Sequence, residues 1–250
     1  MSKVGILTFH RAANYGTALQ AFATEKGIKK MCVDAQIIDY RPQYIERTLK
    51  VRKIRNAKSP KEIASIMVNA ALYPNMAKRK ADNFKRFFQL MDIGDKVCND
   101  VTEVESASKQ YDVILSGSDQ LFNRNITGDD MTYFLPFNHK RKVTFASSFG
   151  ESKVSDKRVG EIASYISDFD YIGVREKTAQ QIMCEIRKVN PLVKSATTVL
   201  DPTFLLTKDE WCSYASNSLK LPKDGYILTY YMIETPLLRS ITKKLKEKTG

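Results

Sequence analysis

The sequence has 250 residues, of which 43% are hydrophobic and 27% charged, a composition that excludes an intrinsically disordered chain. Four scattered cysteines without a Cys-x-x-Cys pair argue against a zinc ribbon and a disulfide framework, and neither a signal peptide nor a membrane-spanning apolar run is present. The formal net charge of +12 makes phosphate-bearing molecules a class of partner to consider. We therefore expect a cytoplasmic globular protein.

The first part of the chain predicts a βαβ unit. Residues 3–9 form a short apolar run that ends in polar residues, and residues 17–30 carry apolar side chains at helical spacing, so a strand, a loop and a helix are expected. Residues 35–40 predict a second strand, because Arg41-Pro42 disfavours helix directly after them. Such a unit implies two parallel strands joined by a right-handed crossover.

The segment 41–90 is strongly basic. A helical pattern begins at Ser59-Pro60, and residues 77–89 predict a second helix in which basic residues alternate with phenylalanines. Its apolar side is expected to pack on the domain and its basic side to face outward. Two interpretations stay open, a solvated helical surface and a peripheral contact with an anionic membrane face or a phosphate-linked sugar lipid.

The second part of the chain repeats strands and helices. Residues 111–116 predict a buried strand, and residues 142–147, 171–174 and 198–200 predict further strands, each followed by a turn or helix. This alternation predicts an α/β fold with a doubly wound, mostly parallel Rossmann-like sheet.

The C-terminal residues predict the beginning of a further unit. A helix is expected at residues 207–215, a new strand at 226–232 and a Lys-rich helix at 236–249. We therefore expect one Rossmann-like domain at residues 1–221 and the start of a truncated second one at residues 222–250.

Polar residues follow the predicted strands, where ligands of an open parallel sheet bind. The turn at residues 14–16 leads into a helix N-terminus, whose free N–H groups favour an anion, although an ordinary βα turn would use the same residue types. Residues 117–120 supply hydrogen-bonding groups for a ligand or a cap for the next helix. Arg175 has a planar fork that suits carboxylate or phosphate, and Glu176 could position that fork or form an ordinary surface pair.

Six blocks of residues share an order and spacing with a known family. They are FHRAANYG with LQA at residues 9–16 and 19–21, IDYRP at 38–42, SGSDQLFN at 116–123, ASSFG at 146–150, VREK at 174–177 and LDPT at 200–203. Together they resemble the polysaccharide pyruvyl transferase family, and the resemblance spans nearly the whole chain.

This resemblance implies an enzyme with two Rossmann-like domains, similar to GT-B glycosyltransferases. It would transfer a pyruvyl group from phosphoenolpyruvate to a hydroxyl pair of a sugar, during exopolysaccharide or cell-wall synthesis on a lipid-linked precursor at the inner membrane face. Phosphoenolpyruvate would be the donor substrate, and neither a cofactor nor a metal is expected. Family members also use a His and an Arg of the C-terminal domain, so a chain ending at Gly250 is expected to be inactive alone.

The reaction needs cations for the donor, an acid and a base. The catalytic candidates are Asp119, as general base or acceptor-positioning group, and His10, as a lower-ranked acid or phosphate contact. The candidates for substrate binding are Asn14, Tyr15, Gly16, Gly117, Ser118, Gln120, Asn123, Ser147, Ser148, Arg175 and Glu176.

Two other functions fit the same pattern less well. A glycosyltransferase with a nucleotide-sugar donor would share the fold and differ in the C-terminal domain. A non-catalytic anion-binding or nucleic-acid-binding module would explain the basic charge. Because the polar residues gather after the strands and not on one basic module, no nucleic-acid partner is expected.

Overall fold

A parallel sheet forms the centre of the protein. The computed structural model describes residues 2–49, 60, 63–64, 67–68, 75–215, 225–230 and 235–249. Within them, seven strands lie in the order β3-β2-β1-β4-β5-β6-β7, and all neighbouring pairs are parallel. The predicted α/β sheet is thus confirmed, and it is parallel throughout. The strands are β1 (Lys3–Leu7), β2 (Asp34–Tyr40), β3 (Ile93–Cys98), β4 (Val113–Ser116), β5 (Lys142–Ser147), β6 (Tyr171–Val174) and β7 (Ala196–Thr198).

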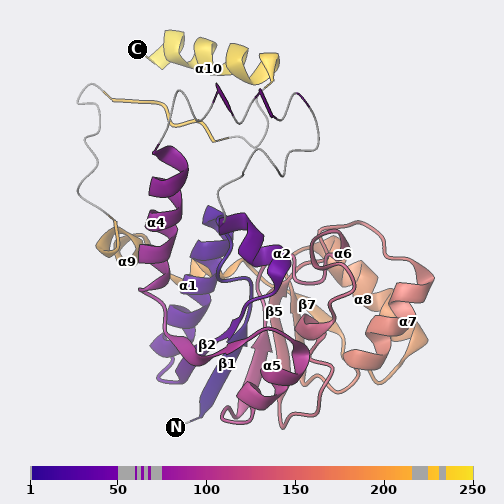
Figure 1. The fold of residues 1–250 in the computed structure, drawn as a ribbon. Helices are drawn as coiled ribbons and strands as arrows, with labels where there is room; N and C mark the ends of the chain where they lie inside the picture. Colours follow the sequence, from indigo (N-terminus) through magenta and orange to yellow (C-terminus); the bar gives the residue numbers. More distant parts are fainter. Residues whose placement is uncertain are drawn as a thin grey trace. The chain divides into compact units, whose positions relative to one another are not determined.

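Helices cover both faces of this sheet (Figure 1). Right-handed crossovers place α1 and α4 on one face and α5, α7 and α8 on the other. In agreement, α1 packs against α4, and α7 packs against α8. The helices are α1 (Tyr15–Lys30), α2 (Gln43–Glu46), α4 (Met76–Phe88), α5 (Val101–Ser108), α6 (Arg124–Thr127), α7 (Asp156–Tyr165), α8 (Lys177–Val189), α9 (Lys208–Ser213) and α10 (Pro236–Thr249), with short 3-10 helices η1 (Arg47–Leu49), η3 (Thr132–Phe134) and η4 (Pro202–Leu205).

Aromatic and aliphatic side chains fill the space between these layers. Phe22 lies at the buried side of α1, while Phe134 and Phe149 belong to the main hydrophobic core. The rings of Phe122 and Phe134 are stacked, with centroids 4.3 Å apart. The loops that follow β4 and β5 are therefore held by core packing as well as by hydrogen bonds.

The basic helix α4 uses its apolar side inside the protein. Two of its phenylalanine rings contact aromatic rings of α1. The ring centroids of Phe84 and Tyr15 are 5.1 Å apart, and those of Phe87 and Phe22 are 5.4 Å apart. The predicted orientation of this helix is confirmed. Of the helix predicted from Ser59-Pro60 onward, residues 60, 63–64 and 67–68 are described and are helical, and its other residues lie outside the described ones. None of the described helices is long and apolar enough to span a bilayer.

Within the sheet, the largest differences from the expected strands are at β7 and β3. β7 comprises Ala196–Thr198, two residues earlier than the predicted strand at 198–200, because the chain must turn at Asp201 into η4. β3 was not expected, since only its last residue is buried and its sequence has no apolar run.

The chain divides into two units, Met1–Thr207 and Lys208–Gly250. The first contains the sheet, and the second contains α9, residues 225–230 and α10. Residues 226–230 form no strand, and the remainder of the strand predicted at 226–232 lies outside the described residues. A second α/β domain is not shown, and the boundary expected at residue 221 stays a prediction.

Candidate active site

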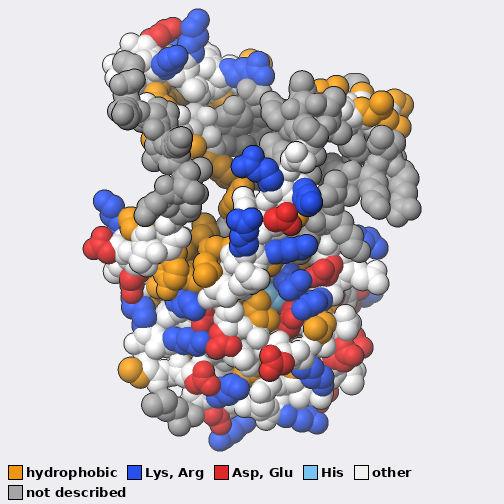
Figure 2. Space-filling view, turned by 60° about the vertical axis from the view of Figure 1, so that its left-hand side comes forward, with side chains coloured by type: hydrophobic (Ala, Val, Ile, Leu, Met, Phe, Trp, Pro, Cys, Tyr) orange, Lys and Arg blue, Asp and Glu red, His pale blue; other side chains and the backbone are white. Residues whose placement is uncertain are grey.

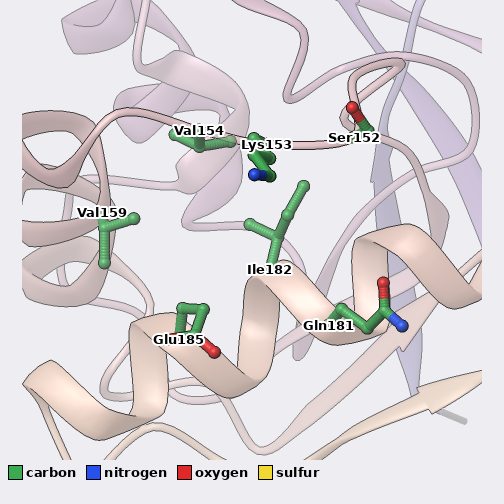
Figure 3. A pocket seen from close by; sticks show the side chains of 7 residues that line it. All are labelled: Ser152, Lys153, Val154, Val159, Gln181, Ile182 and Glu185. Carbon is green, nitrogen blue, oxygen red and sulfur yellow. The ribbon is translucent and has the colours of Figure 1, made fainter.

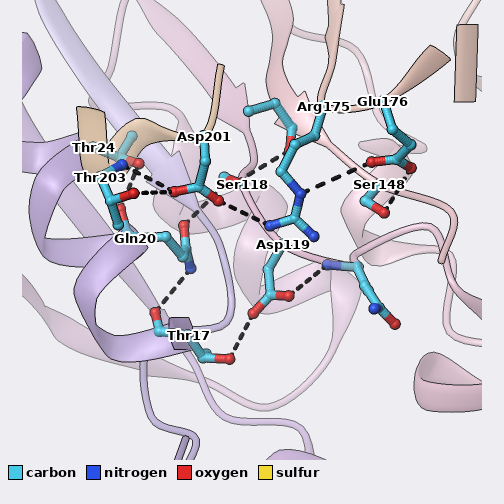
Figure 4. A network of polar contacts seen from close by, with 12 residues as sticks. Thr17, Gln20, Thr24, Ser118, Asp119, Ser148, Arg175, Glu176, Asp201 and Thr203 are labelled. Atoms are coloured by element: carbon cyan, nitrogen blue, oxygen red, sulfur yellow. Dashed lines mark hydrogen bonds and ion pairs between the residues drawn. The ribbon is translucent and has the colours of Figure 1, made fainter. Parts of the chain in front are cut away.

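The strand order reverses between β1 and β4, which is where open α/β sheets bind their ligands. From β1 the chain adds β2 and β3 on one side, and β4 then pairs with the other side of β1. The first turn of α1 and the loop after β4 meet here, and the Thr17 hydroxyl donates to Asp119 Oδ2 at 2.6 Å (Figure 4). Through Thr17, the residue after the predicted turn 14–16, the fold thus joins that turn to the predicted segment 117–120 at the carboxyl edge of the sheet.

The side chain of Gln20 hydrogen-bonds to three segments at this edge of the sheet. It lies on the second turn of α1, is buried, and its Nε2 contacts Thr8 Oγ1, the Phe9 carbonyl and the Thr17 carbonyl at 3.0–3.1 Å. Its Oε1 accepts from the backbone N–H of Ser118 at 3.2 Å. One amide side chain therefore links the end of β1, the start of α1 and the turn after β4.

The turn after β4 has a backbone that requires glycine. Gly117 has a φ of +151°, and a Cβ there would lie 2.1 Å from the carbonyl oxygen of Phe145 on β5. The Gly117-Ser118 peptide is cis. Ser118 is buried and donates through Oγ to the Ala146 carbonyl, so its side chain supports the turn. Asp119 follows with a φ of +87° and is partly exposed.

The Asp119 carboxylate is fixed by two donors. Oδ2 accepts from Thr17, and Oδ1 accepts from the backbone N–H of Gln120 at 2.8 Å. Gln120 Oε1 in turn accepts from Asn123 Nδ2 at 2.7 Å, and Asn123 caps α6 through Asn125 N. The side chain of Asp119 is thus held at the switch point and remains partly exposed, so a ligand can contact it. Asn123 is buried and supports the loop.

Ser147, the last residue of β5, and Ser148, which follows it, are buried and differ in their partners. Ser147 Oγ donates to the Ser116 carbonyl on β4 at 3.0 Å, a contact within the sheet edge. Ser148 Oγ donates to Glu176 Oε1 at 2.8 Å and accepts from the Gly150 N–H at 3.0 Å. Ser147 thus supports the sheet, and Ser148 connects the loop after β5 to the residues after β6.

Arg175 lies directly after β6, beside the switch point. Its Nη1 donates to Asp201 Oδ2 at 3.0 Å, and its Nε lies 3.9 Å from Glu176 Oε2. Figure 4 shows the guanidinium between these two carboxylates, near the loop that carries Asp119. The side chain is 28% exposed, so a ligand can reach it.

The N-terminus of α1 is exposed. Asn14 caps it by accepting from the Thr17 N–H at 3.2 Å, which leaves the N–H groups of Tyr15 and Gly16 directed outward from the first turn. The Tyr15 ring is 58% exposed, and Lys80 Nζ on α4 lies 5.9 Å from its centroid. Tyr15 therefore presents an aromatic face with a cation beside it.

His10 lies behind this surface. It is 1% exposed, its Nε2 lies 3.0 Å from Asp39 Oδ1, and its Nδ1 lies 3.2 Å from the Thr8 carbonyl oxygen. Asp39 also accepts from Arg41 Nη2 at 2.5 Å. Burial opposes ionisation of Asp39, but the hydrogen bonds from His10 and Arg41 outweigh it and hold the pKa of Asp39 well below its ordinary value. A catalytic role for His10 stays a prediction, and this burial favours a supporting role.

The candidate site residues did not include Thr17, Gln20 or Asp201, which connect the predicted residues, although Gln20 and Asp201 lie in two of the blocks that resemble the family. Thr17 and Gln20 are three residues apart on one side of α1, and polar residues at this spacing so close to a helix start are the signal that could have found them. Asp201 forms a cap with Thr203, so its pattern alone indicates a helix start.

A separate pocket lies between the loop after β5 and helices α7 and α8 (Figure 3). None of the predicted site residues lines it. Its lining residues are Ser152, Lys153, Val154, Val159, Gln181, Ile182 and Glu185. Within the described part of the chain, no group of three or more His, Cys, Asp or Glu side chains is placed to hold a metal ion.

The family of the chain follows from a comparison of its sequence. No curated protein and no solved structure gives a significant match. A family model described as polysaccharide pyruvyl transferase matches residues 14–244, a span that includes the switch-point residues from Asn14 to Asp201. The chain therefore belongs to the polysaccharide pyruvyl transferase family.

Proposed function

We propose that the protein transfers the pyruvyl group of phosphoenolpyruvate to two hydroxyl groups of a sugar in a surface glycan or its lipid-linked precursor. Family membership implies a pyruvyl donor and a polysaccharide acceptor. The observation that carries the proposal for this edge of the sheet is that it presents both an accessible guanidinium, Arg175, and a carboxylate in a fixed position, Asp119. The reaction needs both a cation for the donor and a base for the hydroxyl.

The proposed reaction proceeds in two additions. A proton is added to the methylene carbon of phosphoenolpyruvate, which makes C2 electrophilic, and a sugar hydroxyl then forms a bond to C2 and loses its proton. The bond from C2 to the phosphate oxygen breaks, phosphate leaves, and the second hydroxyl adds to C2 and loses its proton. The products are a cyclic ketal and inorganic phosphate.

The residues of the site suit different parts of this reaction. Arg175 would bind the carboxylate or phosphate of the donor, assisted by the N–H groups at the start of α1. Asp119 would accept the hydroxyl proton or orient the acceptor, since Thr17 and the Gln120 N–H already hold its carboxylate. His10 would support Asp39 and the end of β1, with an acid role as the alternative.

Titration calorimetry with phosphoenolpyruvate tests the donor site. We expect the chain to bind phosphoenolpyruvate, and Arg175→Met to weaken binding by about 10- to 100-fold, the effect of losing about 1.5–3 kcal/mol in one hydrogen bond to a charged group. Arg187→Met on the exposed side of α8 is the matched control and should bind like the original chain. Phosphate and pyruvate separate recognition of the whole donor from recognition of its parts.

A transfer assay tests the reaction itself. Phosphoenolpyruvate labelled in its pyruvyl carbons is incubated with lipid-linked glycan precursors, and label in the glycan is compared with released phosphate. Wherever transfer is observed, we expect one labelled pyruvyl group in the glycan for each phosphate released, and Asp119→Asn should abolish the labelling of the glycan. Binding of a nucleotide sugar without binding of phosphoenolpyruvate would contradict the proposal.

We further propose that the acceptor is presented at the inner face of the membrane, which α4 approaches electrostatically. The helix exposes Lys78, Arg79, Lys80, Lys85 and Arg86, while its phenylalanines pack on α1. Figure 2 shows Lys and Arg side chains close together on the side of the molecule that carries α4. Each cation near an anionic surface contributes about 1 kcal/mol.

Sedimentation with vesicles tests this contact. Phosphatidylglycerol vesicles should bind the protein more strongly than phosphatidylcholine vesicles, and the double variant Lys85→Gln/Arg86→Gln should reduce binding. Arg187→Gln/Lys188→Gln on α8 removes the same charge from another surface and should not reduce it. Equal loss in both double variants would show that only net charge matters.

A further inference from the structure

Asp201 holds one side of the Arg175 guanidinium. Its Oδ2 accepts from Arg175 Nη1 at 3.0 Å, and its Oδ1 accepts from the N–H of Thr203 at 3.0 Å and from the Thr203 hydroxyl at 2.8 Å. All these contacts lie at the turn between β7 and η4. The carboxylate therefore has a fixed orientation before it meets Arg175.

On its other side, the guanidinium has an electrostatic contact with Glu176 and no hydrogen bond to it. Glu176 Oε2 lies 3.9 Å from Arg175 Nε, beyond hydrogen-bonding distance, and Glu176 is itself anchored by Ser148 Oγ at 2.8 Å. Within the described residues, neither Nε nor Nη2 of Arg175 donates a hydrogen bond. These two groups form one edge of the planar fork, the edge that can bind a carboxylate or phosphate side-on.

The backbone fixes both partners on the sheet. The Arg175 N–H donates to the Ser147 carbonyl at 3.1 Å, and the Val199 N–H donates to the Val174 carbonyl at 2.9 Å, so hydrogen bonding continues past the ends of β6 and β7. After Asp201 the chain enters η4, which packs on α1 through Leu205 against Gly27. Arg175 and Asp201 thus occupy positions set by the sheet and by the first helix.

We propose that Asp201 is a positioning residue for the donor site. By occupying Nη1, it leaves the Nε–Nη2 edge of Arg175, which lies on the side of Glu176, to bind an anionic group of the donor side-on. The guanidinium, held by Asp201 through a charged hydrogen bond, keeps this orientation before the ligand arrives, which lowers the entropic cost of binding. This inference rests on the proposed function, because it assumes that Arg175 binds the donor.

The test compares Asp201→Asn and Asp201→Glu with the original chain by calorimetric titration of phosphoenolpyruvate and by thermal unfolding. We expect Asp201→Asn to weaken binding about tenfold, because the amide cannot accept from both Arg175 and the Thr203 N–H. Asp201→Glu, which keeps the charge, should restore part of the affinity. Asp156→Asn, an exposed acid in the first turn of α7, is the matched control and should leave the affinity unchanged.

In an assay of pyruvyl transfer, Asp201→Asn should raise KM for phosphoenolpyruvate while KM for the acceptor stays the same. An affinity within twofold of the original chain in Asp201→Asn, beside a large loss in Arg175→Met, would overturn the inference and leave the donor site intact. A loss explained fully by the unfolded fraction at the assay temperature would also overturn it. Absence of phosphoenolpyruvate binding to the original chain would instead overturn the proposed function, and the inference with it.

Discussion

Replacing Gln20 tests whether one buried amide determines the geometry of the site. Gln20→Leu keeps a similar volume but leaves the Ser118 N–H and the Phe9 carbonyl without their partner. A buried polar group that loses its hydrogen bond costs about 1–3 kcal/mol, so the free energy of unfolding should fall by about 3 kcal/mol. At about 2–4 °C per kcal/mol for a domain of this size, Tm should fall by roughly 6–12 °C.

Gln20→Glu is the sharper variant, because it changes only the amide nitrogen. The carboxylate still accepts from Ser118. Its second oxygen, however, faces the oxygens of Thr8, Phe9 and Thr17, which in the original chain contact the Gln20 amide NH₂. Burying an unpaired charge costs several kcal/mol, so Gln20→Glu should be less stable than Gln20→Leu at pH 7.5. Its folded-state pKa lies above the unfolded value of about 4.3, so stability rises as the pH falls from 7.5 toward 5 and the new acid gains a proton to donate.

Guanidinium chloride unfolding at pH 7.5 and pH 5.5 measures both variants. Far-ultraviolet circular dichroism is the suitable signal, since the single tryptophan, Trp211, lies in α9 and outside the sheet unit. Gln181→Glu on the exposed side of α8 is the matched control, with an expected change within about 0.5 kcal/mol. If Gln20→Glu unfolds at the same denaturant concentration as this control at pH 7.5, the reasoning about Gln20 is refuted.

Three further predictions concern stability. Lys142→Met should lower the free energy of unfolding by about 2–4 kcal/mol in denaturant titrations, because two backbone carbonyls lose a buried ammonium donor, whereas exposed Lys140→Met should have little effect. The depressed pKa of Asp39 means that its ionised form stabilises the fold above pH ~4, and this contribution is lost as the pH falls further. In Asp39→Asn, the free energy of unfolding should therefore depend less on pH below pH ~4. An unchanged pH dependence would contradict this. Gly117→Ala should cost more than about 3 kcal/mol through its clash and positive φ, while Gly160→Ala in α7, with open space around it, should stabilise the protein by about 0.5–1 kcal/mol; similar Tm values for the two would refute the backbone argument.

The strands that were predicted best are those in the interior of the sheet. The sequence predicted β5 and β6 with the bounds that the structure has, because polar and turn-forming residues flank both of these short segments. β3 escaped prediction because it is an edge strand that pairs with β2 alone and exposes Asp95, Lys96 and Val97. Its place depends on pairing with a distant strand, which local pattern does not encode.

The site was predictable to the extent that strand ends determine it. Parallel strands place all their carboxyl ends at one edge, so Asp119 and Arg175 could be assigned to the same region from the sequence. The partners that hold them could not. Gln20 lies in a helix between Leu19, which is 36% exposed, and a buried alanine, so apolar periodicity alone assigns the wrong side chain to the interior.

The contact between η4 and α1 also constrains when the site can form during synthesis. Gln20 lies near the beginning of the chain and Asp201 follows the last strand of the sheet, so at about 5–20 residues per second the ribosome adds the second partner on the order of ten seconds or more after the first. Until then the nascent chain can pair β1 with β2 and β4, but Arg175 has no Asp201 to orient it. Donor binding would therefore be acquired late, as one of the final events in the folding of the sheet unit.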